Sequence, residues 1–392
     1  MNLEILNIDV QEFITNHLKT EVTKLILKGT PFKEIPIQEL ANQVVAKQKS
    51  EKKLPTWFAS ENIYYPPKIS IEQTSSEIAA AYKASLFSGD KIIDTTGGFG
   101  VDCYYFAKQF KTVVHCEINK ELSEIVTHNY KQLQVKNIKT FAGNGANYLK
   151  ETKDFFDCIY IDPSRRDDVK GKVFLLKDCQ PYITPKIDFL FTKTNHILVK
   201  TSPILDITQT IGELKNVKEI HVVAIKNEVK ELLFLLEKDF KSTIQIKTIN
   251  IKKETKEQFF FNYKTESYSK YEMPLSYLYE PNAAILKSGG FHHITNQFNV
   301  FKLQEHAHLY TSEQIEEFPG RKFKIIHALP YDKKQIKKLL PENKANITTR
   351  NFPKTVAQIR KETKIKDGGN IFMFFTTNKK KKLIVLICTK LN

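Results

Sequence analysis

A short glycine-rich turn between an apolar strand and a helix constrains this chain more than any other stretch. The strand Ile92-Ile93 ends at Asp94, the turn is Thr95-Thr96-Gly97-Gly98-Phe99-Gly100, and an amphipathic helical pattern runs from Val101 to Phe110. Gly98 and Gly100 carry no Cβ, so the backbone there can approach a ligand closely. A strand, a glycine turn and a helix in this order predict the small-molecule cradle of an α/β fold.

Strand and helix patterns alternate after the turn. Further strands are predicted over 112–116, 138–142, 155–161 and 196–200, with helices between them. Such alternation predicts a largely parallel, doubly wound, Rossmann-like sheet. Ligands bind beyond the carboxyl ends of the strands in sheets of this kind. The unusual side chains of this segment stand at those ends, at Glu117, Asn144 and Asp162-Pro163.

Three parts are predicted along the chain. Residues 1–70 form a helical region and linker, residues 71–270 form the doubly wound domain, and residues 271–392 form a small α+β domain. The apolar runs 220–225 and 232–236 are expected to close the sheet as a hairpin, although the second could be a helix. Trp57 is more often a core residue in such a setting than a base-stacking platform. Residues 278–287 are expected to form a turn into a short helix.

Composition indicates a protein with buried cores and no disulfide framework. Apolar residues make up 41% of the 392 residues, and the five cysteines include no Cys-x-x-Cys pair. No apolar run reaches the roughly 18 residues that a membrane span needs. The N-terminus, Met1-Asn2-Leu3-Glu4, lacks the layout of a signal peptide. A cytoplasmic protein without membrane or metal partners is therefore expected.

Positive charge is concentrated at the C-terminal end. The chain has a formal charge of +16, and residues 321–392 hold 19 Lys and Arg against four Asp and Glu, a net +15. A basic C-terminal domain on a nearly neutral body predicts a polyanionic partner, with nucleic acid first. The alternative, a lysine-rich surface that only solubilises the protein, predicts even spreading.

The glycine turn alone leaves the ligand open. A dinucleotide-binding turn reads Gly-x-Gly-x-x-Gly/Ala, and the third small residue is replaced here by Cys103. Glu117 can accept the hydroxyls of a ribose, as in nicotinamide dinucleotides and in S-adenosylmethionine, and Asn144 stands where an adenine could be met. The sequence Asp162-Pro163-Ser164-Arg165-Arg166 has no place in a dehydrogenase fingerprint.

Together these residues resemble class I S-adenosylmethionine-dependent methyltransferases. The turn is most similar to members that methylate ribosomal or transfer RNA bases, and the whole chain resembles bacterial methyltransferases with a C-terminal THUMP-like domain. The resemblance implies a cofactor site whose members are Gln73, Ser75, Asp94, Thr96, Gly98, Gly100, Glu117, Asn144 and Asp162. Within it, the glycines would admit the methionine part, Glu117 would bind the ribose, and Asn144 would meet the adenine amine. Gln73 and Ser75 would lie near the methionine carboxylate.

The resemblance also implies a catalytic motif. Asp162, Pro163 and Arg165 occupy the place of the Asp/Asn-Pro-Pro-aromatic motif of amino-methyltransferases, which aligns the target amine. Ser164 replaces the second proline, and Arg165 replaces the aromatic residue. A guanidinium can stack on a base or grip a phosphate; alternatively, both arginines pair with Asp167 and Asp168 and only shape the loop.

Two other groups of polar residues are considered as a metal site and as contacts with RNA. The histidines at 292, 293, 306 and 308 have no acidic or cysteine partner at a ligand-like spacing, so a metal site is not predicted. Residues 350–354 and the lysines 361, 364 and 366 are candidate contacts with an RNA backbone, or else an ordinary solvated surface.

The predicted function is therefore an S-adenosylmethionine-dependent methyltransferase that modifies a base nitrogen of rRNA or tRNA, held through the basic C-terminal domain. The alternatives are a methyltransferase for a protein or small molecule, a noncatalytic RNA-binding or assembly factor with the same fold, and a nicotinamide-dependent dehydrogenase.

Overall fold

The computed structural model describes residues 1–165, 175–340 and 342–391 and divides into two compact units. The first unit comprises Met1–Lys218 and Leu232–Ser242, and the second comprises Glu219–Glu231 and Thr243–Asn392. The domain boundaries expected after residues 70 and 270 stay predictions.

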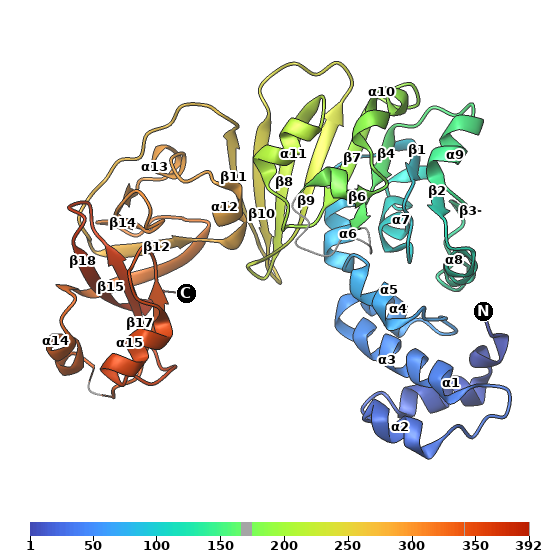
Figure 1. The fold of residues 1–392 in the computed structure, drawn as a ribbon, viewed down its shortest axis with the longest axis horizontal. Helices are drawn as coiled ribbons and strands as arrows, with labels where there is room; N and C mark the ends of the chain where they lie inside the picture. The colour runs from blue at the N-terminus through green and yellow to red at the C-terminus, as the bar shows by residue number, and fades with distance from the viewer. Residues whose placement is uncertain (166–174, 341, 392) are drawn as a thin grey trace. The chain divides into compact units, whose positions relative to one another are not determined.

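The N-terminal part of the first unit is helical, as the sequence predicts (Figure 1). Its elements are η1 (Leu3–Leu6), α1 (Ile8–Asn16), α2 (Val22–Lys28), α3 (Ile37–Lys53), α4 (Pro55–Ala59) and α5 (Lys68–Gln73). Trp57 is fully buried, and its ring centroid lies 6.1 Å from that of Phe99 and 4.9 Å from that of Tyr104. Because Phe99 belongs to the glycine turn, the N-terminal helices support that turn from behind.

The rest of the first unit alternates strands and helices. In chain order these are α6 (Glu77–Ala84), β1 (Gly89–Asp94), α7 (Val101–Phe106), β2 (Phe110–Glu117), α8 (Lys120–Gln132), β3 (Ile138–Ala142), α9 (Gly145–Glu151), β4 (Cys158–Ile161), β5 (Ser164–Arg165), η2 (Leu176–Asp178), β6 (Cys179–Gln180), η3 (Thr184–Lys186), α10 (Ile187–Leu190), β7 (His196–Thr201), α11 (Ile207–Glu213) and β9 (Glu228–Glu237, in this unit from Leu232). The expected doubly wound sheet is confirmed.

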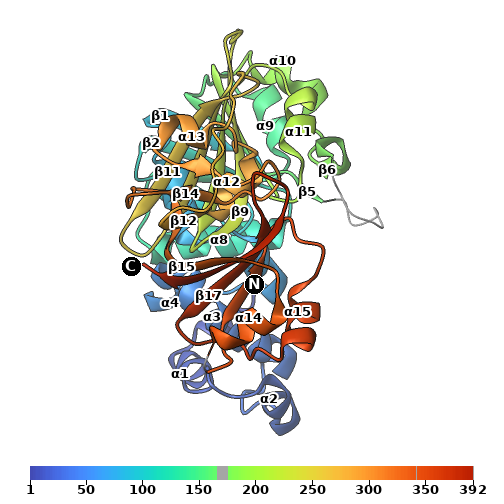
Figure 2. The same ribbon diagram turned by 90° about the vertical axis from the view of Figure 1, so that its left-hand side faces the viewer.

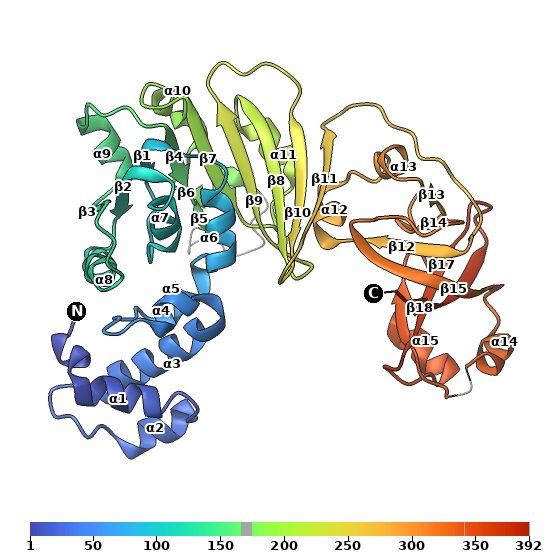
Figure 3. The same cartoon turned by 180° about the vertical axis from the view of Figure 1, so that it is seen from behind.

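The strand order of this unit fixes where a ligand can bind. Its strands follow the order β3-β2-β1-β4-β7-β9, parallel except for the β7–β9 pair (Figure 3). The chain moves outward from β1 to β3, then returns to the other side of β1 for β4 and β7. Right-handed crossovers in opposite directions place their helices on opposite faces of the sheet, and the loops separate between β1 and β4. This switch point is the expected ligand crevice.

A small two-stranded ribbon follows the switch point directly. In it, β5 and β6 pair in antiparallel fashion, with Ser164 opposite Gln180 (Figure 2). Arg165 lies in β5, but its side chain is outside the described part of the structure, as are Arg166, Asp167 and Asp168.

The second unit contains two sets of strands. Its elements are β8 (Val217–Ile225, in this unit from Glu219), β10 (Gln245–Ile251), β11 (Lys256–Asn262), β12 (Tyr277–Pro281), α12 (Ala283–Ser288), α13 (Ile294–Gln297), β13 (Phe301–Lys302), β14 (Tyr310–Ser312), β15 (Gly320–Pro330), α14 (Lys333–Lys338), β16 (Asn346–Thr349), α15 (Val356–Thr363), β17 (Ile371–Thr377) and β18 (Leu383–Lys390). Both apolar runs expected to close the sheet are strands, within β8 and β9.

A seven-stranded sheet with the order β13-β14-β12-β15-β18-β17-β16 forms the C-terminal part of the second unit. Ile336 of α14 and Ile359 of α15 are fully buried in one core with Met373 and Phe375 of β17. The turn expected at residues 278–281 is wrong, because this segment is the strand β12, paired with β14 and β15. In the described part of the chain no helix is long and apolar enough to span a membrane.

Candidate active site

The carboxyl ends of three neighbouring strands carry acidic residues that the sequence predicts for the site. Asp94 is the last residue of β1, Glu117 is the last residue of β2, and Asp162 directly follows β4. Asp94 pairs in register with His115 of β2 and Tyr160 of β4, so these ends lie side by side. The structure therefore brings the predicted acidic residues to one edge.

The two glycines of the turn meet different surroundings. Both have positive φ, +54° at Gly98 and +79° at Gly100. A Cβ on Gly100 would lie 2.1 Å from the Tyr130 hydroxyl oxygen, so packing alone accounts for that glycine. Among the described residues, a Cβ on Gly98 would have one neighbour within 4 Å, the carbonyl oxygen of Thr96 at 3.9 Å. Gly98 is thus the residue that leaves open space at the edge, where a ligand could approach the backbone.

Backbone amides fix the carboxylate of Glu117. The amide of Gly98 donates to Oε2 at 2.9 Å, and the amide of Asn119 donates to Oε1 at 2.7 Å. The side chain is half-buried, and each oxygen keeps lone-pair capacity for another donor. Glu117 is therefore preorganised beside the glycine turn as a two-point acceptor, which is what a pair of vicinal hydroxyls requires.

Asp94 is buried behind the turn and holds it in place. Its Oδ1 accepts hydrogen bonds from the amide of Thr96 at 2.8 Å and from the Thr96 hydroxyl at 3.1 Å, and Oδ2 accepts from the Cys103 thiol at 3.5 Å. Burial raises the pKa of Asp94 to about 7, the nearby carboxylates of Asp102 and Asp162 add to the rise, and the Thr96 hydrogen bonds oppose it. Near neutral pH this side chain changes charge easily.

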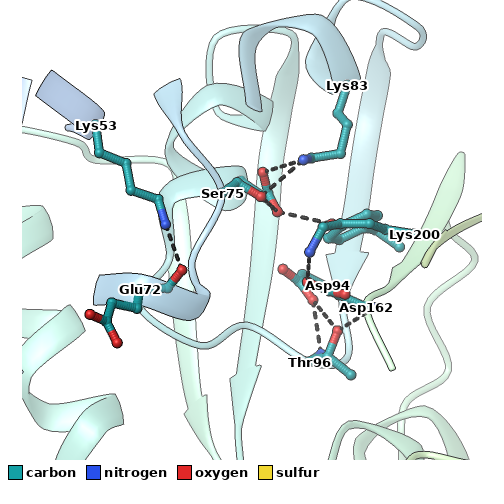
Figure 4. Close-up of polar contacts among 10 residues, drawn as sticks. Lys53, Glu72, Ser75, Lys83, Asp94, Thr96, Asp162 and Lys200 are labelled. Atoms are coloured by element: carbon teal, nitrogen blue, oxygen red, sulfur yellow. Dashed lines mark hydrogen bonds and ion pairs between the residues drawn. The ribbon is translucent and has the colours of Figure 1, made fainter. Parts of the chain in front are cut away.

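Asp162 is tied to both neighbouring strands (Figure 4). Its backbone amide donates to Oγ1 of Thr96 at 2.8 Å, and its carboxylate Oδ2 forms an ion pair with Nζ of Lys200 on β7. The side chain is 31% exposed and that of Lys200 is 15% exposed. Pro163 is buried next to it. The predicted catalytic carboxylate thus already holds a cation on one oxygen and keeps the other for a further donor.

The predicted contact Ser75 belongs to a buried polar network. Its hydroxyl donates to Oδ2 of Asp102 at 2.9 Å and accepts from Nζ of Lys83 at 3.0 Å, and the Tyr160 hydroxyl donates to the same Oδ2 at 2.9 Å (Figure 4). Lys83 is fully buried, with Nζ 3.2 Å from Oδ1 of Asp102. This network links α6, α7 and β4 below the turn. A cofactor contact by Ser75 stays a prediction.

Two further predicted contacts lie at exposed positions. Asn144 caps α9 by accepting the amide of Ala146 on Oδ1 at 2.9 Å, and the side chain is exposed. Gln73 is the last residue of α5 and is also exposed. Their roles toward adenine and the methionine carboxylate stay predictions.

Sequence reasoning missed Lys200 and His115. Lys200 interrupts an apolar strand one residue before its carboxyl end, a signal that could have indicated a site residue. His115 is fully buried under the turn with Nε2 3.2 Å from the carbonyl oxygen of Gly98, and burial lowers its pKa to about 4. It is therefore neutral at physiological pH. Nothing in its sequence context distinguishes it from an ordinary strand residue.

The histidines considered as metal ligands from the sequence lie in the second unit. His293 stacks on Phe261 and His308 stacks on Phe291, with ring centroids 4.9 Å and 3.6 Å apart. Over residues 1–165, 175–340 and 342–391 no group of three His, Cys, Asp or Glu side chains is placed to hold a metal ion.

A Rossmann-like sheet with an acidic residue at the end of each of its first two strands, a glycine turn and an Asp-Pro corner defines a methyltransferase class of fold. The chain is 30% identical to a "putative methyltransferase" from Porphyromonas gingivalis W83, and the match covers 99% of this chain and 98% of that one with a TM-score of 0.88. The chain therefore belongs to the same methyltransferase family. Residues 320–390 match a family model described as THUMP domain-like, and residues 277–319 match one described as a ferredoxin-like domain.

A sequence relative is more distant. An "uncharacterized RNA methyltransferase" of Mycoplasma mobile is 28% identical over 91 residues, which is 22% of this chain. The match spans a quarter of that relative's length.

The burial of Asp94 predicts a specific pH dependence of stability. Because its folded pKa of about 7 lies above the unfolded value, its favourable protonated state is present at pH 4 and is lost as pH rises toward 7. We expect Asp94→Asn to gain stability relative to the native protein over this range, with a limiting slope of about 1.4 kcal/mol per pH unit. Urea unfolding followed by the fluorescence of Trp57, the single tryptophan, measures it.

Asp90→Asn is the matched control, because this carboxylate lies on the same strand and is 71% exposed. A difference between Asp94→Asn and the native protein that stays constant from pH 4 to pH 7 would contradict the prediction.

Proposed function

We propose that this protein transfers the methyl group of S-adenosylmethionine to a base nitrogen of rRNA or tRNA. The observation that carries the proposal is the fixed pair of carboxylates at the switch point: Glu117 beside the open face of Gly98, and Asp162 across the turn from it. In this proposal residues 71–270 bind the cofactor, residues 271–392 hold the RNA, and residues 1–70 support the glycine turn.

The residues at the strand ends fit an adenosyl cofactor. Glu117 offers two oxygens that the amides of Gly98 and Asn119 already orient, which suits the two ribose hydroxyls. The space beside Gly98 suits the approach of the methionine part to the backbone. Asn144 and Gln73, both exposed, would contact the adenine and the methionine carboxylate.

Methyl transfer depends more on aligning the target amine with the methyl group than on activating either group. When bound, S-adenosylmethionine supplies a methyl carbon whose bonding pair stays on sulfur as the new nitrogen–carbon bond forms. The free Oδ1 of Asp162 and the carbonyl oxygen of Pro163 would accept hydrogen bonds from the target amine and direct its lone pair. Such positioning can contribute about 7 to 11 kcal/mol, and the proton leaves the acceptor nitrogen afterwards.

Two observations support an RNA substrate: the positive charge of the C-terminal residues and their similarity to a THUMP-like domain. Residues 321–392 carry a net +15, and 320–390 match the THUMP domain-like model. Lys361, Lys364 and Lys366 are exposed around the end of α15, whereas Arg350 is engaged by Glu280 at 2.7 Å. These lysines are thus the better candidates for phosphate contacts among the residues that the sequence selected. The name of the Mycoplasma relative agrees with an RNA substrate.

Glu117→Ala should weaken binding of S-adenosylhomocysteine by about 10- to 100-fold, because hydrogen bonds to a charged group contribute about 1.5 to 3 kcal/mol. Isothermal titration measures the change, and NAD should give no binding heat. Glu121→Ala removes an exposed carboxylate from the adjacent helix and serves as the control. Affinity within twofold of the native protein would rule out the assigned role of Glu117.

Asp162→Ala should reduce methyl transfer at least about 100-fold and leave S-adenosylhomocysteine affinity within about threefold, because alignment is lost but the ribose contact is kept. The assay is transfer of tritiated methyl to total RNA from a strain that lacks the gene. Asp188→Ala, at a side chain that is 79% exposed, is the control. Full activity of Asp162→Ala would remove this residue from the mechanism, and an inactive native protein would favour the noncatalytic alternative.

Replacing Lys361, Lys364 and Lys366 by Gln should weaken binding of labelled bulk tRNA. Each lost phosphate contact should lower the slope of log affinity against log salt by roughly 0.7 to 0.9. Fluorescence anisotropy over a salt series measures the slope. The matched control replaces Lys28, Lys33 and Lys52, which are equally exposed in the first unit. An equal loss in both triple variants would indicate general charge attraction instead of a site.

A further inference from the structure

The ion pair between Asp162 and Lys200 is placed by the sheet itself. The β4–β7 register pairs Ile161 with Val199, so the next residue of each strand, Asp162 and Lys200, stands at the shared carboxyl edge. On its other side Lys200 lies opposite Leu233 of β9, which is fully buried. Figure 4 shows the Lys200 amine directed at Asp162 beside Asp94.

A lysine at residue 200 carries a desolvation cost, because the strand before it is buried. Ile197, Leu198 and Val199 before it are at most 1% exposed. A largely buried ion pair seldom adds net stability, because desolvation offsets the attraction, and an apolar residue would serve the fold as well. The burial of the strand alone does not call for an ammonium group at residue 200, and its ion pair with Asp162 lies at the strand edge.

The charged groups around Asp162 explain why a lysine stands at residue 200. Asp94 is close enough for Asp162 to contribute to the rise of its pKa, and Asp102 contributes as well. Three carboxylates gathered in a partly buried region repel one another. Lys83 compensates Asp102 at 3.2 Å, and Lys200 compensates Asp162. Thr96 is the neutral neighbour of Asp162 from the glycine turn.

We propose that Lys200 is the positioning residue of the transfer reaction: it holds Oδ2 of Asp162 and leaves Oδ1 as the acceptor for the substrate. This inference rests on the proposed function. Without the ion pair, the Asp162 carboxylate could rotate and carry Oδ1 away from the substrate.

The test compares Lys200→Met, Lys200→Arg, Asp162→Asn and the double variant Asp162→Asn/Lys200→Met. Transfer to total RNA from the deletion strain is followed at pH 7. We expect Lys200→Met to lower transfer about 10- to 100-fold, because the Asp162 carboxylate loses the charged partner that fixes its orientation, and to leave the affinity for S-adenosylhomocysteine within about threefold. Lys200→Arg, which keeps the cation, should restore most of the activity.

The double variant separates positioning from a structural role. Asn needs no cation, so Lys200→Met should have little further effect in the Asp162→Asn background, on transfer or on the urea midpoint. Lys91→Met is the control, because Lys91 pairs with Asp154 at 2.7 Å on β1, away from its carboxyl end. Equal losses from Lys200→Met in both backgrounds would overturn the inference.

The outcomes also separate this inference from the proposed function. Transfer by the native protein with no coupling between residues 162 and 200 would leave the function standing and refute the role of Lys200. No transfer to RNA by the native protein would refute both, whatever coupling the urea midpoints show.

Discussion

The hydrogen bonds of Thr96 hold together the part of the structure on which its chemistry depends. The Thr96 amide and hydroxyl donate to Asp94 at the end of β1, and its hydroxyl oxygen accepts the backbone amide of Asp162 at the end of β4. The Thr96 side chain therefore bridges the ends of β1 and β4, the two strands between which the strand order reverses. Together with the hydrogen bond from the Thr95 amide to the carbonyl oxygen of Tyr160, this link fixes the glycine turn relative to the Asp-Pro corner.

Much of this edge could be predicted because its signals are local. The strand, the glycine turn and the residues at the strand ends are read from stretches of ten residues or fewer, and parallel sheets bring strand ends together by construction. His115 and the network around Lys83 could not be found in this way, and the local signal at Lys200 did not identify its partner. Lys200 meets Asp162 across 38 residues of sequence, and a lysine or histidine inside a strand has no local pattern that names its partner.

In the second unit, the charge pattern of the sequence also did not reveal which cations are paired internally. The sequence selected Arg350 as an RNA contact, but its guanidinium donates to Oε1 of Glu280 at 2.7 Å, and Arg321 pairs with the other oxygen. Glu280 is 3% exposed and belongs to the ferredoxin-like segment, whereas both arginines belong to the THUMP-like segment. These arginines therefore join two segments of one unit. A net charge counted over a sequence cannot distinguish such internal pairs from cations that are free for a polyanion.

The balance of charge at the strand ends is itself informative about the ligand. Among the residues that the structure describes, Asp94, Asp102, Asp162 and Glu117 gather around the turn, and the ammonium groups that pair with them are Lys83 and Lys200. With every carboxylate of this described set ionised, negative charge would exceed positive charge, which the raised pKa of Asp94 partly relieves by protonation. A cationic ligand would relieve it instead and favour the ionised form of Asp94. An anionic pyrophosphate would add to the repulsion, so the electrostatics of this edge favour a sulfonium nucleoside over a dinucleotide.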